Sequence, residues 1–119
     1  MEILYSNTFK KSAKKLLKHY KGFKKDLHSF LASLEDNPNQ GTKLAQGLYK
    51  VRIKNSDNNK GKSAGYRIVT YSVIEDEIFL VDIYSKSEME NIADEAIDMI
   101  VKEHYFDISA KLDMLEKQL

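Results

Sequence analysis

The chain has 119 residues, which suits one compact domain and is too short for two ordinary ones. Hydrophobic residues make up 42% and charged residues 31%, a globular composition that excludes an intrinsically disordered chain. The absence of cysteine excludes disulfides, thiolate nucleophiles and thiolate-bound metals. No apolar segment near the N-terminus is long enough for a signal peptide or a membrane span. We therefore expect a cytoplasmic protein with a single domain over residues 1–119 and no membrane contact.

The formal net charge of +1 hides two basic regions and one acidic region. Eight lysines and no acid lie within residues 10–25, and seven cations with a single acid lie within residues 43–67. Residues 88–98 instead hold five acids and no cation. This segregation predicts positive surface on one side of the molecule, with a polyanion as a plausible partner.

The N-terminal third is predicted to be a short strand followed by a helical hairpin. Residues 2–5 are apolar and β-compatible, and residues 6–8 are N-cap candidates. Apolar residues then recur at helical spacing on both sides of Gly22, until Asn37-Pro38-Asn39 ends the pattern. They are Phe9, Ala13, Leu16, Leu17 and Tyr20, then Phe23, Leu27, Phe30, Leu31 and Leu34.

After a loop over residues 39–42 the apolar period changes from about 3.6 to 2. Tyr49, Val51 and Ile53 alternate with Lys50, Arg52 and Lys54. This pattern predicts a strand with one cationic face. Residues 55–64 are too hydrophilic for a core element and predict a loop that carries Lys60 and Lys62.

Residues 65–74 and 78–84 are rich in β-forming residues, and the short acidic segment between them predicts a hairpin turn. Ser87 and Glu90 have the spacing of a capping box, so a helix is expected to begin at Ser87. Its apolar stripe is formed by Met89, Ile92, Ala93, Ala96, Ile97, Ile100 and Val101. We expect this stripe to pack on the sheet or on the helical hairpin. The predicted fold is α+β, with helices packed on one face of a small twisted sheet.

The sequence contains none of the common enzyme motifs. No His/Asp/Glu cluster has metal-binding spacing, no glycine-rich phosphate loop is present, and no serine lies in a nucleophile elbow. His19, His28 and His104 lie in or near predicted helices, away from the basic strand, so surface or packing roles are expected for them. We therefore expect no metal and no cofactor.

Strand pairing would bring the cations of the predicted strands and loop together. RNA cleavage through the 2′-hydroxyl needs a general base, a general acid and positive charge beside the phosphate. Arginine binds phosphate oxygens in a bidentate manner, and a lysine among other cations can have its pKa lowered. Such a cluster fits a ribonuclease without histidine, but it also fits an ordinary solvated strand face. Charge alone does not decide between these two interpretations.

Three blocks of the sequence resemble RelE/HigB-type toxins, in the order and spacing of that family. They are Leu48-Tyr49-Lys50-Val51-Arg52-Ile53, Lys60-Gly61-Lys62-Ser63-Ala64-Gly65-Tyr66-Arg67-Ile68-Val69-Thr70-Tyr71, and Ile83-Tyr84-Ser85-Lys86-Ser87-Glu88-Met89. The resemblance spans about residues 2–92 and leaves residues 93–119 as a C-terminal helical extension. It implies a RelE-like fold, in which an N-terminal helical hairpin packs on a small, largely antiparallel sheet.

The resemblance also implies a function: the toxin of a type II toxin–antitoxin module, which cleaves mRNA in the ribosomal A site without a metal. Its implied partners are the ribosome, mRNA and a cognate antitoxin that neutralises it. The residues implied to be catalytic are Lys50, Arg52, Arg67 and Lys86. Those implied to bind RNA are Lys54, Lys60, Lys62 and Tyr84, where Tyr84 would stack on a base, orient a phosphate, or merely be a half-buried strand aromatic.

Ile92 stands where some RelE members have a catalytic tyrosine, so the general base is not identified. His104 and Tyr105 are the residues of the tail that could replace that tyrosine as a proton acceptor. Two other functions stay open. One is a ParE-like gyrase inhibitor, against which the dense basic set argues, and the other is a catalytically inactive RNA-binding or antitoxin-binding module. Leu112, Leu115 and Leu119 are expected either to continue the packing of the apolar stripe or to contact the antitoxin.

Overall fold

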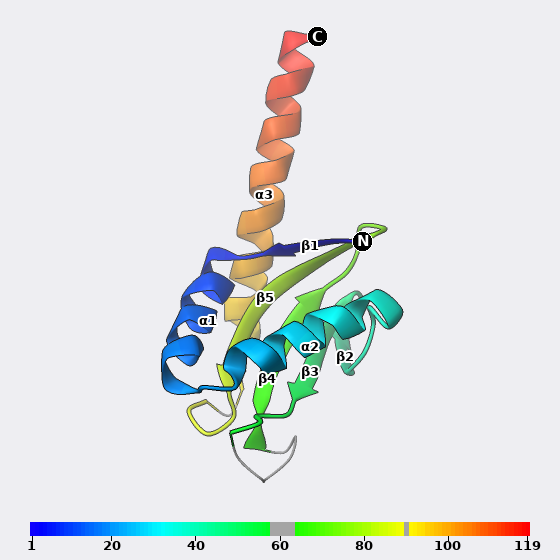
Figure 1. Cartoon of the computed structure of the whole chain (residues 1–119). Helices are drawn as coiled ribbons and strands as arrows, with labels where there is room; N and C mark the ends of the chain where they lie inside the picture. Colours follow the sequence, from blue (N-terminus) through cyan, green and yellow to red (C-terminus); the bar gives the residue numbers. More distant parts are fainter. Residues whose placement is uncertain (58–63, 90) are drawn as a thin grey trace.

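The computed structural model describes residues 1–57, 64–89 and 91–119, without the side chains of residues 106–111. Within these residues the elements are β1 (Glu2–Tyr5), α1 (Asn7–His19), α2 (Phe23–Asp36), β2 (Thr42–Ala45), β3 (Leu48–Ile53), β4 (Tyr66–Tyr71), β5 (Glu77–Ser85) and α3 (Asp94–Gln118). The fold is α+β, as predicted, with an N-terminal helical hairpin, a sheet and a C-terminal helical extension (Figure 1).

The sheet has the strand order β1-β5-β4-β3-β2, and every neighbouring pair is antiparallel except β1 with β5. The prediction of a largely antiparallel sheet is therefore confirmed. Strand β2 was not predicted, because its four residues are all exposed and carry no apolar alternation. Gly41 and Gly47 lie on either side of this edge strand with φ angles of 100° and 75°, which glycine adopts without strain.

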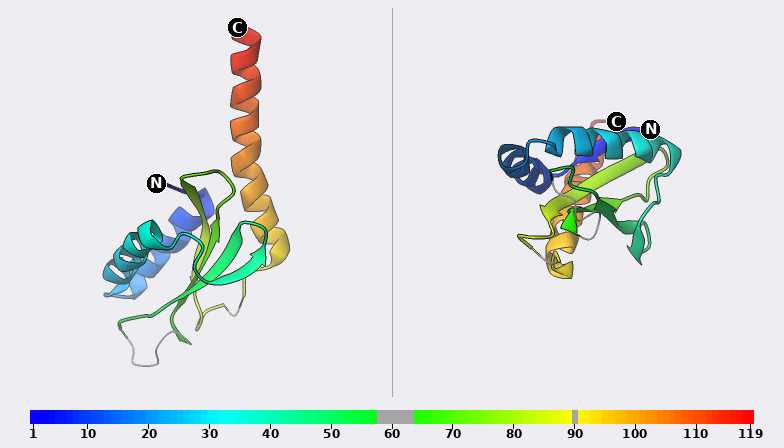
Figure 2. Two further views of the ribbon diagram at one scale, coloured as in Figure 1. Left: turned by 90° about the vertical axis from the view of Figure 1, so that its right-hand side faces the viewer. Right: turned by 60° about the horizontal axis from the view of Figure 1, so that its bottom comes forward.

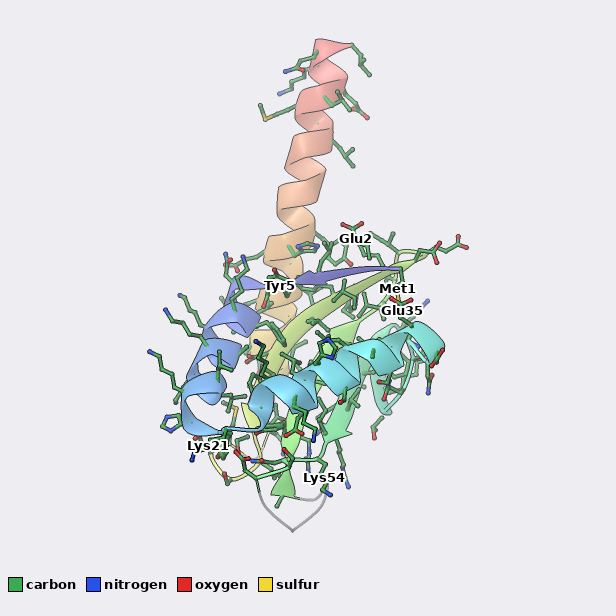
Figure 3. All side chains as sticks on the ribbon, in the orientation of Figure 1. Met1, Glu2, Tyr5, Lys21, Glu35 and Lys54 are labelled. Carbon is green, nitrogen blue, oxygen red and sulfur yellow. The ribbon has the colours of Figure 1, made fainter. Side chains whose placement is uncertain are left out.

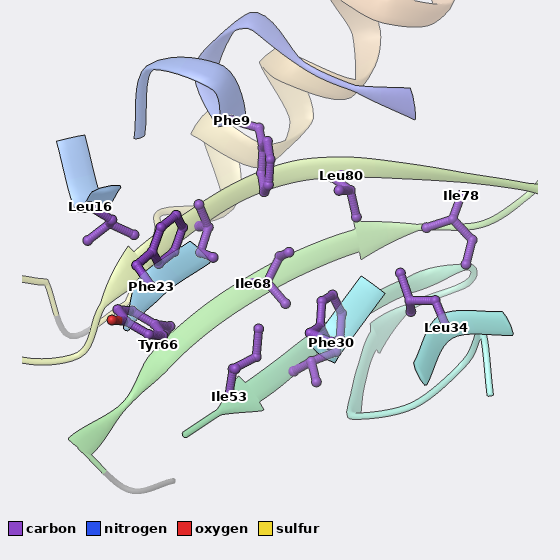
Figure 4. Packing of buried hydrophobic residues seen from close by; sticks show 12 residues of the cluster. Phe9, Leu16, Phe23, Phe30, Leu34, Ile53, Tyr66, Ile68, Ile78 and Leu80 are labelled. Atoms are coloured by element: carbon purple, nitrogen blue, oxygen red, sulfur yellow. The ribbon is translucent and has the colours of Figure 1, made fainter. Parts of the chain in front are cut away.

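Helices cover both faces of the sheet, so the expectation that they share one face is wrong (Figure 2). The helices α1 and α2 pack on one face, and α3 packs on the other. The hairpin-side core is formed by Phe9, Leu16, Phe23, Phe30, Leu34, Val51, Ile53, Tyr66, Ile68, Ile78, Leu80 and Ile83 (Figure 4). The smaller α3-side core is formed by Val69, Phe79, Val81, Ile97 and Ile100, with Ile92 and Val101 packed against it. Two cores arise because strand residues alternate between the two faces.

Ser6 is the N-cap of α1, as predicted. Its hydroxyl accepts a hydrogen bond from the Phe9 N–H at 2.8 Å and donates one to the Val81 carbonyl at 2.6 Å. The cap therefore satisfies an otherwise unpaired helix N–H and also ties the start of α1 to β5.

The last helix begins at Asp94 and not at Ser87, so the predicted start is wrong. The chain turns directly after β5, and the Ser87 hydroxyl lies 2.9 Å from that of Ser85 and 3.4 Å from that of Tyr20. A hydroxyl engaged in this way does not cap a helix. Glu90, the other half of the expected capping box, lies outside the described residues.

The prediction for the apolar stripe is confirmed in part: Ile92, Ile97, Ile100 and Val101 pack on the sheet and not on the helical hairpin, whereas Met89 and Ala93 precede α3 and are exposed. Beyond Tyr105 the helix projects away from the rest of the described chain (Figure 1). Leu112, Leu115 and Leu119 are exposed there, so the expectation that they continue the packing of the stripe is wrong.

Candidate functional site

A row of three polar side chains crosses the centre of the sheet. Arg52 on β3 is the register partner of Arg67 on β4, and Arg67 is the partner of Tyr84 on β5. Adjacent strands lie about 4.8 Å apart, so the three residues are immediate neighbours. Val51, Ile68 and Ile83, which are next to them in sequence, belong to the hairpin-side core. Because side chains alternate along a strand, the row faces the side of the sheet that α3 covers.

Arg67 is the central member of the row and is only 4% exposed. Its guanidinium donates a hydrogen bond to the Tyr66 carbonyl at 3.1 Å. Burial lowers the pKa of Arg67, and the nearby charge of Arg52 lowers it further. An arginine remains charged under such a shift. Arg52 and Arg67 thus place two positive charges on neighbouring strands.

Tyr84 closes the row on β5 and is 5% exposed. A ring buried to this extent offers no face for a base to stack on in this conformation. Its hydroxyl is buried and has no hydrogen-bond partner among the described residues. Burial raises the pKa of Tyr84, although the Ile92 backbone and the charge of Arg67 act in the opposite direction. At neutral pH this hydroxyl is therefore protonated and is available as a proton donor.

Lys50 lies two residues before Arg52 on β3 and therefore on the same face. Its ammonium donates a hydrogen bond to the Asn91 side-chain oxygen at 2.9 Å. Asn91 belongs to the connection between β5 and α3, so this connection reaches across to β3. Sequence reasoning missed Asn91, because an isolated asparagine in a segment expected to be helical carries no recognisable pattern.

The remaining predicted cations lie at the strand ends or outside the described residues. Lys54 is exposed, directly after β3, and Figure 3 shows it at the same end of the molecule as Lys21. Lys86 directly follows β5, and its backbone N–H donates to the Gly65 carbonyl at 2.9 Å. Lys60 and Lys62 lie outside the described residues. The structure thus brings together Lys50, Arg52, Arg67 and Tyr84, with Lys54 and Lys86 flanking them.

Carboxylates hold the start of the predicted basic loop against the helical hairpin. Asp26 accepts hydrogen bonds from the Ser56 N–H at 2.9 Å and from its hydroxyl at 3.0 Å. Both Asp57 carboxylate oxygens lie 3.1 Å from the Gly22 N–H that donates to them. A Cβ atom at Gly22 would lie 2.2 Å from the Ser56 hydroxyl, so a larger residue there would require the Ser56 side chain, and its hydrogen bond to Asp26, to move.

The lysines of α1 lie on the opposite side of the sheet from the row. Phe9 and Leu16 of this helix are buried in the hairpin-side core, while Lys10, Lys14 and Lys18 are exposed. The α1 lysines of the first basic region therefore do not join the cations of the second. The prediction that the positive surface gathers on one side of the molecule is wrong for them. The row and its flanking cations come from the second region, together with Lys86.

His104 and Tyr105 lie away from the row. His104 stacks on Phe79 with 4.1 Å between ring centroids, and Tyr105 contacts Tyr71 edge-on at 5.5 Å. Phe79 precedes Tyr84 by five residues on β5, which corresponds to roughly 16 Å along the strand. Burial raises the pKa of Tyr105 to about 12, with Glu77 contributing. Neither residue is placed to replace the tyrosine that some RelE members have where this chain has Ile92.

Other sites of chemistry are not evident in the described part of the chain. Among residues 1–57, 64–89 and 91–119, no three His, Asp or Glu side chains are grouped so that they could hold a metal ion. None of the described helices is both long and apolar enough to span a membrane. A cavity of about 760 Å³ lies beside β1 and α3 and is lined by Tyr5, Phe79 and His104, at the opposite end of β5 from Tyr84.

The comparison with protein families covers nearly the whole chain. The family described as "RelE toxin of RelE / RelB toxin-antitoxin system" matches residues 1–118, so the match also includes α3, which the sequence resemblance had left out. A search of curated proteins gives no significant match. The sheet with its polar row and the full-length family match lead to one conclusion: the chain belongs to the RelE family of toxins of toxin–antitoxin systems.

Proposed function

We propose that this RelE-family toxin is a ribosome-dependent endoribonuclease, which cleaves mRNA in the A site and is held inactive by a cognate antitoxin. The observation that carries the proposal is the row of Arg52, Arg67 and Tyr84 in direct register across three strands. A buried guanidinium, a second cation and a protonated phenol in one row are suited to an RNA phosphate.

In the proposed reaction the 2′-oxygen of one nucleotide attacks the adjacent phosphorus, and the bond from phosphorus to the 5′-oxygen breaks. The products are a 2′,3′-cyclic phosphate and a 5′-hydroxyl. Arg67 and Arg52 stabilise the negative charge that develops on the phosphate oxygens. The 2′-hydroxyl proton passes to a general base, and a general acid protonates the departing 5′-oxygen.

Among the groups of the site, Tyr84 carries a phenol that is protonated at neutral pH and can donate to the phosphate or to the departing oxygen, although its raised pKa makes it a weaker acid than an ordinary tyrosine. Lys50 and Lys86 supply further positive charge at the ends of the row. No described side chain is assigned as the general base, since Ile92 is apolar and His104 and Tyr105 lie too far along β5. If the ribosome–mRNA complex supplies the general base, cleavage requires the ribosome, as proposed.

Access to the row also favours a reaction on the ribosome. Because Arg67 is almost fully buried, a phosphate reaches its guanidinium only if neighbouring groups move. Asn91 of the β5–α3 connection reaches the row through its hydrogen bond with Lys50. Binding to the ribosome would both shift this connection and hold the flexible RNA in position.

Expression of the chain followed by sequencing of mRNA 5′ ends tests the proposal. Cuts inside translated messages, lost when translation initiation is blocked, are the expected result. Gyrase-dependent DNA damage would instead indicate a ParE-like inhibitor, and growth without either effect an inactive binding module. Purified protein that cuts naked mRNA as fast as ribosome-bound mRNA would contradict the requirement for the ribosome.

A further inference from the structure

The connection between β5 and α3 reaches across the sheet at Asn91. The side-chain oxygen of this residue accepts a hydrogen bond of 2.9 Å from the ammonium of Lys50 on β3, although β4 lies between β3 and β5. The two residues are 41 positions apart in the sequence. Asn91 is exposed, so the packing of the core does not depend on its side chain. The effect of the contact therefore falls mainly on Lys50 and the site around it.

The position of Asn91 is fixed by the residues that follow it. Ile92 packs against the α3-side core, which contains Val69. Val69 is the register partner of Lys50 on the neighbouring strand. The helix α3 begins directly afterwards, at Asp94. Asn91 is therefore anchored beside the place where the Lys50 side chain leaves its strand.

Lys50 gains a defined position from this contact. It lies two residues before Arg52 on β3, on the face that carries the row, and its side chain is half-buried. A lysine ammonium ends a flexible four-carbon stem, which loses its freedom when the ammonium binds a phosphate. The hydrogen bond to Asn91 restricts the stem before the RNA arrives, so less freedom is lost on binding.

The chemical nature of the Asn91 side chain suits this role. An amide oxygen accepts one of the three ammonium N–H groups and is neutral, so Lys50 keeps its full positive charge and two further donors. A carboxylate at the same place would form an ion pair and offset that charge. Asn91 therefore orders the ammonium without weakening its attraction for a phosphate.

We propose that Asn91 is a positioning residue for the cleavage reaction, which holds the Lys50 ammonium beside the row for the RNA phosphate. The inference rests on the proposed function and adds to it a residue that acts through Lys50. The four-carbon stem of Lys50 lets the ammonium follow Asn91 when the connection shifts on the ribosome, so the contact is compatible with the access that Arg67 requires.

Cleavage rates on programmed ribosomes test the role of Asn91. Asn91→Ala should lower kcat/KM about 3-fold to 10-fold, the cost of ordering one long side chain on binding. Met89→Ala is the matched control, since Met89 is 42% exposed on the same connection, and it should leave the rate unchanged. In a Lys50→Met chain, Asn91→Ala should cause no further loss. An equal loss with and without Lys50 would overturn the proposal, because Asn91 would then act independently of it.

Asn91→Asp separates positioning from a merely structural role. The carboxylate can accept the same hydrogen bond, so the melting temperature should stay the same or rise. The cleavage rate should nevertheless fall at least as far as in Asn91→Ala, because the charge of Lys50 is offset. A structural role would instead be rescued by this change. A variant that cuts at the unchanged rate would therefore overturn the proposal.

Nuclear magnetic resonance tests the contact without cleavage. The order parameter of the Lys50 Cε atom should exceed that of Lys54, which is exposed on the same segment, and should fall to the Lys54 level in Asn91→Ala. Equal order at Lys50 with and without the Asn91 amide would overturn the proposal. A chain with ordered Lys50 that cuts no mRNA on ribosomes would instead remove the proposed function, and the role of Asn91 with it.

Discussion

The two faces of the sheet are built from the same strands but differ in what they hold. The hairpin-side face is apolar from Ile78 and Leu80 to Ile53 and Tyr66, apart from the buried carboxyl of Asp82, which accepts a hydrogen bond from Ser12. The α3-side face is apolar at one end, where Phe79 meets α3, and polar at the other, where Arg67 and Tyr84 lie. The larger core on the hairpin side stabilises the sheet. The rigid sheet in turn holds the charged groups at the polar end of its α3-side face in position. Because side chains alternate along β3, β4 and β5, the residues of the larger core and the residues of the proposed site lie on opposite faces of the sheet.

The largest expected effect comes from removing the helix that covers one face of the sheet, with a shorter truncation as the control. Deletion of residues 88–119 removes the cover of the α3-side core and should give insoluble or unfolded protein, since Val69, Phe79 and Val81 would be exposed. Deletion of residues 106–119 should leave the fold largely intact, because that segment projects from the body. Solubility and circular dichroism check both. A folded product of the longer deletion would show that the hairpin side suffices for folding.

Arg67→Ala should abolish toxicity without unfolding the protein. Removing one preorganised donor to the transition state costs on the order of 100-fold to 1000-fold in rate. Growth assays and mRNA end mapping at matched expression measure the loss, and thermal melting measures the fold. Growth arrest equal to that of the unchanged chain would remove Arg67 from the site.

Tyr84→Phe should lower the cleavage rate without lowering the stability of the fold. Its hydroxyl is buried without a partner among the described residues, so its removal should leave stability unchanged or raise it by up to about 1 kcal/mol. Cleavage should fall about 10-fold to 100-fold, since a hydrogen bond to a charged group is lost. The rate on programmed ribosomes and a urea unfolding curve provide the two measurements. A variant with unchanged rate would make Tyr84 a packing residue.

The smallest effect is expected on the hairpin side, at Asp82. Burial raises the pKa of this carboxyl, although hydrogen bonds from Ser12 and the Ile83 N–H partly offset the rise. The folded state therefore binds a proton that the unfolded state releases, and stability falls as pH rises from the ordinary Asp pKa through the raised folded value. Asp82→Asn should flatten this part of the profile. Unfolding free energies measured from roughly pH 4 to 7 test it.

The sequence predicted the parts of the fold that depend on local periodicity. Helical spacing around Gly22 predicted the hairpin, and the alternation along β3 placed Lys50 and Arg52 on one face. The row could not be predicted from that pattern, because it depends on which residues of separate strands become register partners. The exposed strand β2 and the contact of Asn91 with Lys50 likewise depend on tertiary pairing. The start of α3 was wrong because the Ser87 hydroxyl serves a turn.

Strand β1 has a consequence for the order in which the chain folds. It pairs in parallel with β5, and Ser6 bonds to the Val81 carbonyl 75 residues further along the sequence. A contact over this separation forms slowly and only after the whole intervening chain exists. Strand β1 and the N-cap of α1 therefore find their partners only after β5 has been synthesised, so this edge of the sheet closes later than the hairpin of α1 and α2 and the pairing of β3 with β4.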